Sequence, residues 1–174
     1  MVVVYKSKYG KTKQYAEWIA KALGAPIFEN AEITPQELAE HDIVIYGGGL
    51  YAGGIDGIKL VTKNQCKALV VFTVGVADPA VTDYAEILNR AFTPAQLAAT
   101  KIFHLRGGID YSRLSLPHRA MMAMMKRIIE KKPPEKRGSD DMGVLETYGK
   151  NVDFSSEKTI APLVEHVRGI MEGK

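Results

Sequence analysis

Four short runs of apolar residues constrain the fold of this 174-residue chain more than any other feature. They are rich in β-branched residues and lie at Val2–Tyr5, Ile43–Tyr46, Leu69–Phe72 and Ile102–Leu105. Apolar runs that do not alternate with polar residues predict strands buried on both faces. A weaker fifth strand is predicted near Pro26–Glu29, after Gly24. Strands of this kind belong to a sheet that helices cover on both sides.

Amphipathic patterns between these runs predict the covering helices. Apolar residues from Tyr15 to Leu23 recur at helical spacing, and Gly24 is placed to end that helix. Asp78 and Pro79 are typical of an N-cap and a first helical position. The apolar face of that second helix comprises Val81, Tyr84, Ala85, Leu88 and Phe92.

Two further helices complete the alternation. Thr93 and Pro94 start a short one. Pro162 predicts that the last one either begins near Thr159 or is kinked there, because proline has no N–H to donate. The apolar side of the last helix comprises Ile160, Leu163, Val164, Val167 and Met171. Alternating strands and helices imply a parallel sheet, and ligands of such folds bind beyond the carboxyl ends of the strands. The loops at those ends are Ser7–Thr12, Gly47–Gly57, Thr73–Pro79 and Gly107–Ser115.

The first of these loops, "SKYGKT", ends like a nucleotide-binding P-loop. That motif requires a glycine five places before Gly10, and Tyr5 stands there, so an ATP or GTP loop is not predicted. A turn from a strand into a helix still directs free backbone N–H groups and the positive end of a helix dipole at one point. Polar side chains beside it are Ser7, Lys8, Lys11 and Thr12. Two interpretations stay open: a site for a single phosphate, or a capped helix with solvated lysines.

The second loop, "GGGLYAGG", matches G-x-G-x-x-A only formally, because it opens no helix of the kind that a dinucleotide site requires. Its glycines allow the backbone to approach a ligand closely. Leu50 and Tyr51 would then cover a flat ring; the alternative is that Tyr51 packs on its own protein. The third loop, "TVGVADP", adds small residues and backbone groups beside them.

These loops resemble those of a flavodoxin-type domain. "VVVYKSKYGKTKQYAEWIA" is similar to its opening, whose phosphate loop reads [ST]-x-[ST]-G-x-T; Ser7, Gly10 and Thr12 match, and Tyr9 stands where Ser or Thr is usual. "IVIYGGGLYAGG" resembles the second flavin loop, with Tyr51 in the aromatic position, and "FTVGVADP" lies where the third belongs. "LRGGIDYSRLSLPHRAMMAMMKRIIEKK" and "YGKNVDFSS" resemble a longer-chain branch that includes flavodoxin-like protoporphyrinogen oxidases.

The resemblance implies a three-layer α/β fold of the flavodoxin kind, with a five-stranded parallel sheet of order 2-1-3-4-5 and helices on both faces. It implies a single domain over residues 1–174, with an extra Met-rich helix and loop at about 107–154. The implied cofactor is FMN, with its phosphate held by Ser7, Lys8, Tyr9, Gly10, Lys11 and Thr12. Its ring would be flanked by Gly49, Leu50, Tyr51, Ala52, Gly53, Thr73, Val74, Gly75, Val76 and Ala77. No catalytic side chain and no metal ligand is predicted.

The helix predicted from Pro117 to Lys132 has an apolar face and is followed by basic residues. Its face comprises Met121, Met124, Met125 and Ile128, widened by Met122 and Ile129. The interpretation favoured by sequence is that the methionines cover the sheet. The alternative is a basic amphipathic helix that contacts an anionic membrane or a partner protein. The segment "RGSDDMGVLETYGKNVDF" is predicted to be irregular.

Composition and charge limit the possible partners, the disulfides and the cellular location of this chain. The net charge of +3 is weak support for a nucleic-acid partner, and the lone Cys66 excludes an internal disulfide. No apolar run reaches bilayer-spanning length, so a cytoplasmic protein is predicted. Electron-carrier flavodoxins are usually strongly acidic, and this sequence is not.

Three functions follow from the resemblance. The first is an FMN-binding redox protein that passes electrons to or from a partner protein. The second is an FMN-dependent oxidoreductase on a small organic substrate, of the protoporphyrinogen-oxidising, quinone-linked kind, with Tyr111 and Arg113 as first substrate contacts. The third is a flavodoxin fold without cofactor that serves as an interaction module, which the unusual Tyr9 would favour.

Overall fold

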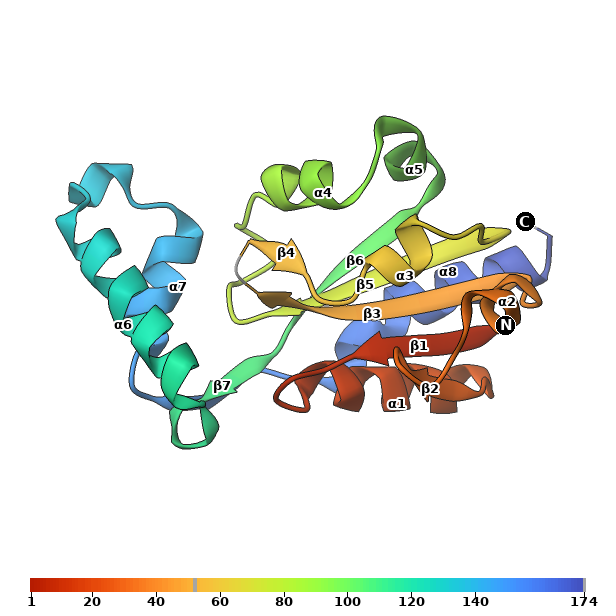
Figure 1. The fold of residues 1–174 in the computed structure, drawn as a ribbon, viewed down its shortest axis with the longest axis horizontal. Helices are drawn as coiled ribbons and strands as arrows, with labels where there is room; N and C mark the ends of the chain where they lie inside the picture. The colour runs from red at the N-terminus through yellow and green to blue at the C-terminus, as the bar shows by residue number, and fades with distance from the viewer. Residues whose placement is uncertain (52, 174) are drawn as a thin grey trace.

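The computed structural model describes residues 1–51 and 53–173. Its centre is a sheet of five parallel strands in the order β2-β1-β3-β5-β6, and the short β4 pairs only with β3 (Figure 1). The parallel strands are β1 (Val2–Lys6), β2 (Ile27–Glu29), β3 (Ile43–Tyr51), β5 (Ala68–Gly75) and β6 (Lys101–Arg106). Counted along the parallel strands alone, this is the predicted order 2-1-3-4-5, which is confirmed.

Helices cover both faces of this sheet and give three layers. Alternate strand residues point to opposite faces, so that Val3 and Ile45 lie in one core and Val2 and Val44 in the other. One face is covered by α1 (Lys11–Leu23) and α8 (Ala161–Met171). The other is covered by α2 (Pro35–Ala39), α3 (Lys59–Thr62), α4 (Ala85–Ala91) and α5 (Pro94–Ala99).

Several helix ends lie where the sequence placed them. Gly24 ends α1 in the left-handed conformation, with φ 62°. Thr93 and Gln96 form a capping box at the start of α5. A 3₁₀ turn, η3 (Glu157–Ile160), leads into α8, as the position of Pro162 predicted. Met171 is an exception, because 56% of its surface is exposed at the end of α8.

The helix predicted to begin at Pro79, with Asp78 as its N-cap, begins six residues later, at Ala85, so the predicted start was wrong. The Asp78 carboxylate accepts a hydrogen bond from the Ala80 N–H at 3.0 Å and stabilises a turn instead. The Asp78 carbonyl accepts another from the Thr82 hydroxyl at 2.7 Å, and Val81 is 67% exposed. Asp-Pro therefore marks a turn here, and not the first turn of a helix.

The segment after β6 forms a separate hairpin at the carboxyl end of the sheet, away from both sheet faces (Figure 1). Its base is an antiparallel pair, β7 (Gly108–Asp110) with β8 (Asn151–Asp153). Between them lie η1 (Tyr111–Arg113), α6 (Leu116–Lys131), η2 (Pro134–Lys136) and α7 (Ser139–Thr147). The prediction of an irregular segment was wrong, since α7 occupies it. Within the described ranges, no helix has the length and apolarity to cross a bilayer.

Candidate functional site

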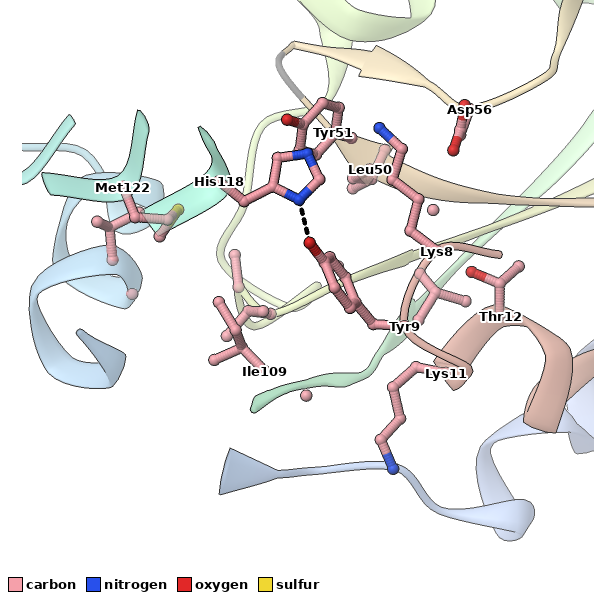
Figure 2. Close-up of a pocket in the computed structure, with 18 of the residues that line it drawn as sticks. Lys8, Tyr9, Lys11, Thr12, Leu50, Tyr51, Asp56, Ile109, His118 and Met122 are labelled. Carbon is pink, nitrogen blue, oxygen red and sulfur yellow. Dashed lines mark hydrogen bonds between the residues drawn. The ribbon is translucent and has the colours of Figure 1, made fainter. Parts of the chain in front are cut away.

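A cavity of about 310 Å³ lies beyond the carboxyl ends of β1, β3 and β5. Its floor and walls come from the three loops that follow those strands, and its roof from α6 and α7 (Figure 2). A parallel sheet brings these strand ends together, which explains why segments far apart in sequence meet there.

The first loop forms a tight turn into α1. Gly10 has φ 88°, in the left-handed region, and its N–H donates to the Ser7 hydroxyl oxygen at 3.1 Å. The first bond inside the helix joins the Gln14 N–H to the Gly10 carbonyl at 2.9 Å, so the N–H groups of the first helical turn, between Gly10 and Gln14, are left for a ligand. Ser7, Lys8, Tyr9, Lys11 and Thr12 line the cavity. Gly10 shapes the turn without lining the cavity itself. The arrangement suits a single anionic group.

The three cations near the site, Lys8, Lys11 and Arg106, are not equivalent. Lys11 Nζ lies 2.6 Å from the Asp153 carboxylate, and Arg106 lies 3.8 Å from the Asp78 carboxylate and 3.8 Å above the Phe154 ring. Lys8 Nζ instead lies 3.4 Å from the centroid of the Tyr51 ring. Among these three, Lys8 is the cation with no carboxylate partner in the described part of the chain. Positive potential at the cavity therefore comes mainly from Lys8.

The ion pair of Lys11 also changes the acidity of its partner. Partial burial acts to raise the pKa of Asp153, but the hydrogen bond from Lys11 and the bonds from Ser155 outweigh burial and lower this pKa to about 2. The carboxylate thus stays charged and joins β8 to the start of α1.

The glycines of the second loop serve internal packing as much as a ligand. A Cβ on Gly47 would overlap the Phe72 ring, and one on Gly48 would lie 2.8 Å from the Asp56 carbonyl. Gly49, Leu50, Tyr51 and Gly53 do line the cavity, and Leu50 and Tyr51 lie in the β3–β4 hairpin (β4 is Gly54–Ile55). The predicted Ala52 lies outside the described residues.

The third loop lines the cavity with Val74, Gly75, Val76 and Ala77. Two of its carbonyl groups are fixed by hydrogen bonds. The Gly75 carbonyl accepts one from the Gly107 N–H at 2.6 Å, and the Val76 carbonyl accepts one from Arg106 Nε at 3.1 Å. This anchoring fixes the edge of the cavity.

Thr73, predicted to contact the ring, does not line the cavity. It is fully buried, and its hydroxyl forms a 2.6 Å hydrogen bond with Nδ1 of His104. The His104 ring stacks on Tyr84 at 3.6 Å, and burial lowers the pKa of His104, which favours the neutral imidazole. Side chains alternate between the two faces of a sheet, so Thr73 points to the face where His104 and Tyr84 lie, whereas the next residue, Val74, lines the cavity.

The roof was not predicted from the sequence. Three of the four methionines expected to cover the sheet instead line the cavity, since α6 lies beyond the strand ends (Figure 1); these are Met121, Met122 and Met125, whereas Met124 is exposed. Gly143, Val144 and Thr147 of α7 complete this wall. Tyr111 packs against Tyr148 with ring centroids 5.3 Å apart, and neither Tyr111 nor Arg113 is among the lining residues.

His118 connects the roof to two of the loops. Its Nδ1 is hydrogen-bonded to the Tyr9 hydroxyl, and its ring lies edge-on to Tyr51 with centroids 4.8 Å apart (Figure 2). Sequence reasoning missed it because the four histidines show no metal-ligand spacing. A usable signal was its position three and four residues before Met121 and Met122, on the same helix face.

Comparisons with solved structures find flavodoxins and other flavoproteins at low sequence identity. A WrbA-like flavodoxin from Agrobacterium tumefaciens is 23% identical, with a TM-score of 0.43 over 57% of this chain and 73% of that one. The two-electron reduced flavodoxin of Megasphaera elsdenii is 14% identical, with a TM-score of 0.45 over 60% and 82%. A flavoprotein from Lactobacillus acidophilus, solved in complex with FMN, is 11% identical, with a TM-score of 0.41 over 60% and 90%.

Sequence comparison gives the family directly. No curated protein matches the chain. The model of a flavodoxin domain matches residues 2–136, which include β1 to β6, all three loops of the cavity, and α6. This match covers most of the chain, and the chain belongs to the flavodoxin domain family.

Proposed function

We propose that this chain binds FMN in the cavity and acts as a redox protein. One observation carries the proposal: a left-handed glycine turn at the start of α1 opens into the same cavity as Leu50, Tyr51 and the third loop. The glycine turn suits a phosphate, and Leu50, Tyr51 and the third loop suit a flat ring. The cavity volume of about 310 Å³ is at the lower end of the range of small-molecule sites.

The residues present fit this cofactor. The space beside Gly10 is open, because a Cβ built there meets nothing within 4 Å. Backbone N–H groups of the turn, with the hydroxyls of Ser7 and Thr12, would hold the phosphate. Leu50 and Tyr51 would cover one side of the ring, and the anchored third loop would border it. FMN itself supplies the redox chemistry, and the protein orients it and sets its electrostatic environment.

For the redox partner, the roof favours a small organic molecule over a docking protein. The wall formed by Met121, Met122 and Met125 roofs the cavity and would hinder a docking protein from reaching a bound ring. The resemblance to the protoporphyrinogen-oxidising branch suggests a porphyrinogen substrate with a quinone acceptor. Steady-state turnover of protoporphyrinogen with a quinone tests this candidate. Rapid electron exchange with a carrier protein, without such turnover, would instead favour electron transfer to a partner protein. We place this activity in the cytoplasm, which the lone Cys66 supports.

The cofactor proposal is tested with two matched glycine variants. Gly10 and Gly24 both have positive φ, 88° and 62°, and both have open space around a built Cβ. Gly10→Val and Gly24→Val therefore impose a similar backbone strain, about 1–2 kcal/mol. Only Gly10 belongs to the turn at the cavity.

We expect the purified wild type and Gly24→Val to take up FMN, seen as quenching of flavin fluorescence on titration. Gly10→Val is expected to bind about a hundredfold more weakly, because at least two hydrogen bonds to a charged group are lost. A wild-type protein that takes up no FMN would refute the proposal and leave the cofactor-free interaction module. Equal affinity of both variants would place the phosphate elsewhere.

A further inference from the structure

The side of α6 that faces away from the cavity carries an exposed apolar stripe. At about 100° per residue, seven exposed residues fall within an arc of about 120°. We call this arc the outer face of α6; it comprises Leu116, Pro117, Ala120, Met124, Arg127, Ile128 and Lys131. The cavity-lining His118, Met122 and Met125 lie on the other side of the same helix.

The apolar residues of the outer face are unusually exposed. Leu116 is 79% exposed, Met124 57% and Ile128 53%. Six large apolar side chains in the described ranges are this exposed, and these three share one helix face. Single exposed apolar residues are ordinary, but a contiguous group of them indicates an interaction surface.

The net charge of α6 and the residues that follow it indicates which kind of partner would bind the outer face. Residues 116–137 carry seven Lys and Arg against two Glu, a net charge of +5, whereas the whole chain carries +3, so the rest of the chain is net negative. Lys126 pairs with Glu130 at 3.5 Å, and Lys132 pairs with Asp141 at 2.8 Å. Arg127 and Lys131, on the outer face itself, have no carboxylate partner among the described residues.

We propose that the outer face of α6 docks on an anionic phospholipid bilayer. Leu116, Met124 and Ile128 would enter the boundary between head groups and acyl chains, and Arg127 and Lys131 would contact phosphates of the head groups. The outer face contains no acidic residue that an anionic surface would repel. A helix of 16 residues, about 24 Å long, can lie in the plane of the interface. The proposal does not depend on the cofactor.

Co-sedimentation of the full chain with vesicles tests the docking. The probes are vesicles of equal parts phosphatidylcholine and phosphatidylglycerol, and vesicles of phosphatidylcholine alone. The wild type is expected to sediment with the anionic vesicles and to stay in solution with the neutral ones. Raising the salt concentration should weaken the binding, because exposed charges are screened.

Two pairs of matched variants identify the surface. Met124→Glu/Ile128→Glu is compared with Val81→Glu/Met171→Glu, which adds the same charge at exposed apolar residues elsewhere. Arg127→Gln/Lys131→Gln is compared with Lys59→Gln/Lys63→Gln, which removes the same charge at the same spacing. Both outer-face variants should bind anionic vesicles more weakly by on the order of tenfold, and both controls should bind like the wild type. Circular dichroism before sedimentation checks that each variant is folded.

Three results would overturn the proposal. One is a wild type that does not bind anionic vesicles. Another is an outer-face variant pair that binds as well as its controls. The third is a dimer, detected by light scattering, that Met124→Glu/Ile128→Glu dissociates while vesicles remain unbound; the outer face would then belong to an interface between two copies of the chain.

Discussion

The Tyr9 hydroxyl, in the turn before α1, hydrogen-bonds to Nδ1 of His118 on α6, 109 residues further along the chain. The same imidazole ring lies against Tyr51 of the second loop. Tyr9 stands where flavodoxin phosphate loops usually carry Ser or Thr, whose hydroxyl would face the phosphate. Here the longer side chain reaches the roof instead, so this departure from the family pattern has a structural use.

We expect His118→Ala to loosen the roof. The substitution removes the hydrogen bond to Tyr9 and the ring contact with Tyr51, which together stabilise the packing of α6 over the cavity by about 1–2 kcal/mol. Hydrogen exchange of the α6 amides should then become roughly tenfold faster. His41→Ala, at the amino end of β3 and thus at the opposite end of the sheet, is the control. Unchanged exchange in α6 would show that the roof is held by its methionines alone.

Replacing Lys8 should make bound flavin harder to reduce. The Lys8 ammonium has no carboxylate partner among the residues described and lies at the cavity, so it stabilises negative charge added on reduction. In Lys8→Gln we expect the potential of the second reduction step to fall by tens of millivolts, measured by spectroelectrochemical titration. Lys13→Gln, which removes an exposed α1 lysine paired with Glu17, should leave the potential unchanged. Equal potentials in the wild type, Lys8→Gln and Lys13→Gln would show that Lys8 does not influence reduction of the flavin.

The pair Asp153–Lys11 predicts a component of acid sensitivity. The pKa of Asp153 is about 2 in the folded chain against an ordinary value of 3.8. A depressed carboxyl pKa stabilises the fold at pH values above the ordinary value, and this contribution is lost as the pH falls through about 4 to about 2. Asp153→Asn should therefore lower the free energy of unfolding at neutral pH and flatten its decline across that window. Denaturant titrations at several pH values measure both effects. Parallel declines in variant and wild type would contradict the assignment.

Two glycine-to-alanine changes should have opposite effects on stability. In Gly47→Ala the new methyl group would overlap the buried Phe72 ring, so we expect a loss of about 1–3 kcal/mol or more. In Gly169→Ala, inside α8, the methyl group meets nothing within 4 Å, and we expect a gain of about 0.5–1 kcal/mol from higher helix propensity. Urea unfolding of both variants measures the difference. A neutral Gly47→Ala would show that the second glycine loop is free to repack.

Local sequence patterns accounted for most of the sheet and much of the helical cover. Unbroken β-branched runs marked the four strong strands, and Gly24 and Thr93 marked a helix end and a helix start, because these signals act within a few residues. The prediction of an N-cap at Asp78 was wrong for the same reason. An Asp-Pro pair suits a turn as well as the start of a helix, and only the surrounding contacts decide between them. The role of the glycines in the second loop was also ambiguous from sequence. The Phe72 ring that fills the space beside Gly47 belongs to β5, so the need for glycine there depends on how the strands pair.

Sequence alone was enough to predict the five parallel strands along the chain, the three loops that meet at one end of the sheet, and the turn at Gly10. These depend on hydrophobic periodicity and on backbone preferences of single residues. Three features depend on how distant segments pack together: α6 roofs the cavity, His118 contacts both Tyr9 and Tyr51, and Thr73 is buried. Contacts between residues a hundred positions apart depend on how β7 and β8 orient the hairpin, and an amphipathic pattern does not specify which surface its apolar side will meet.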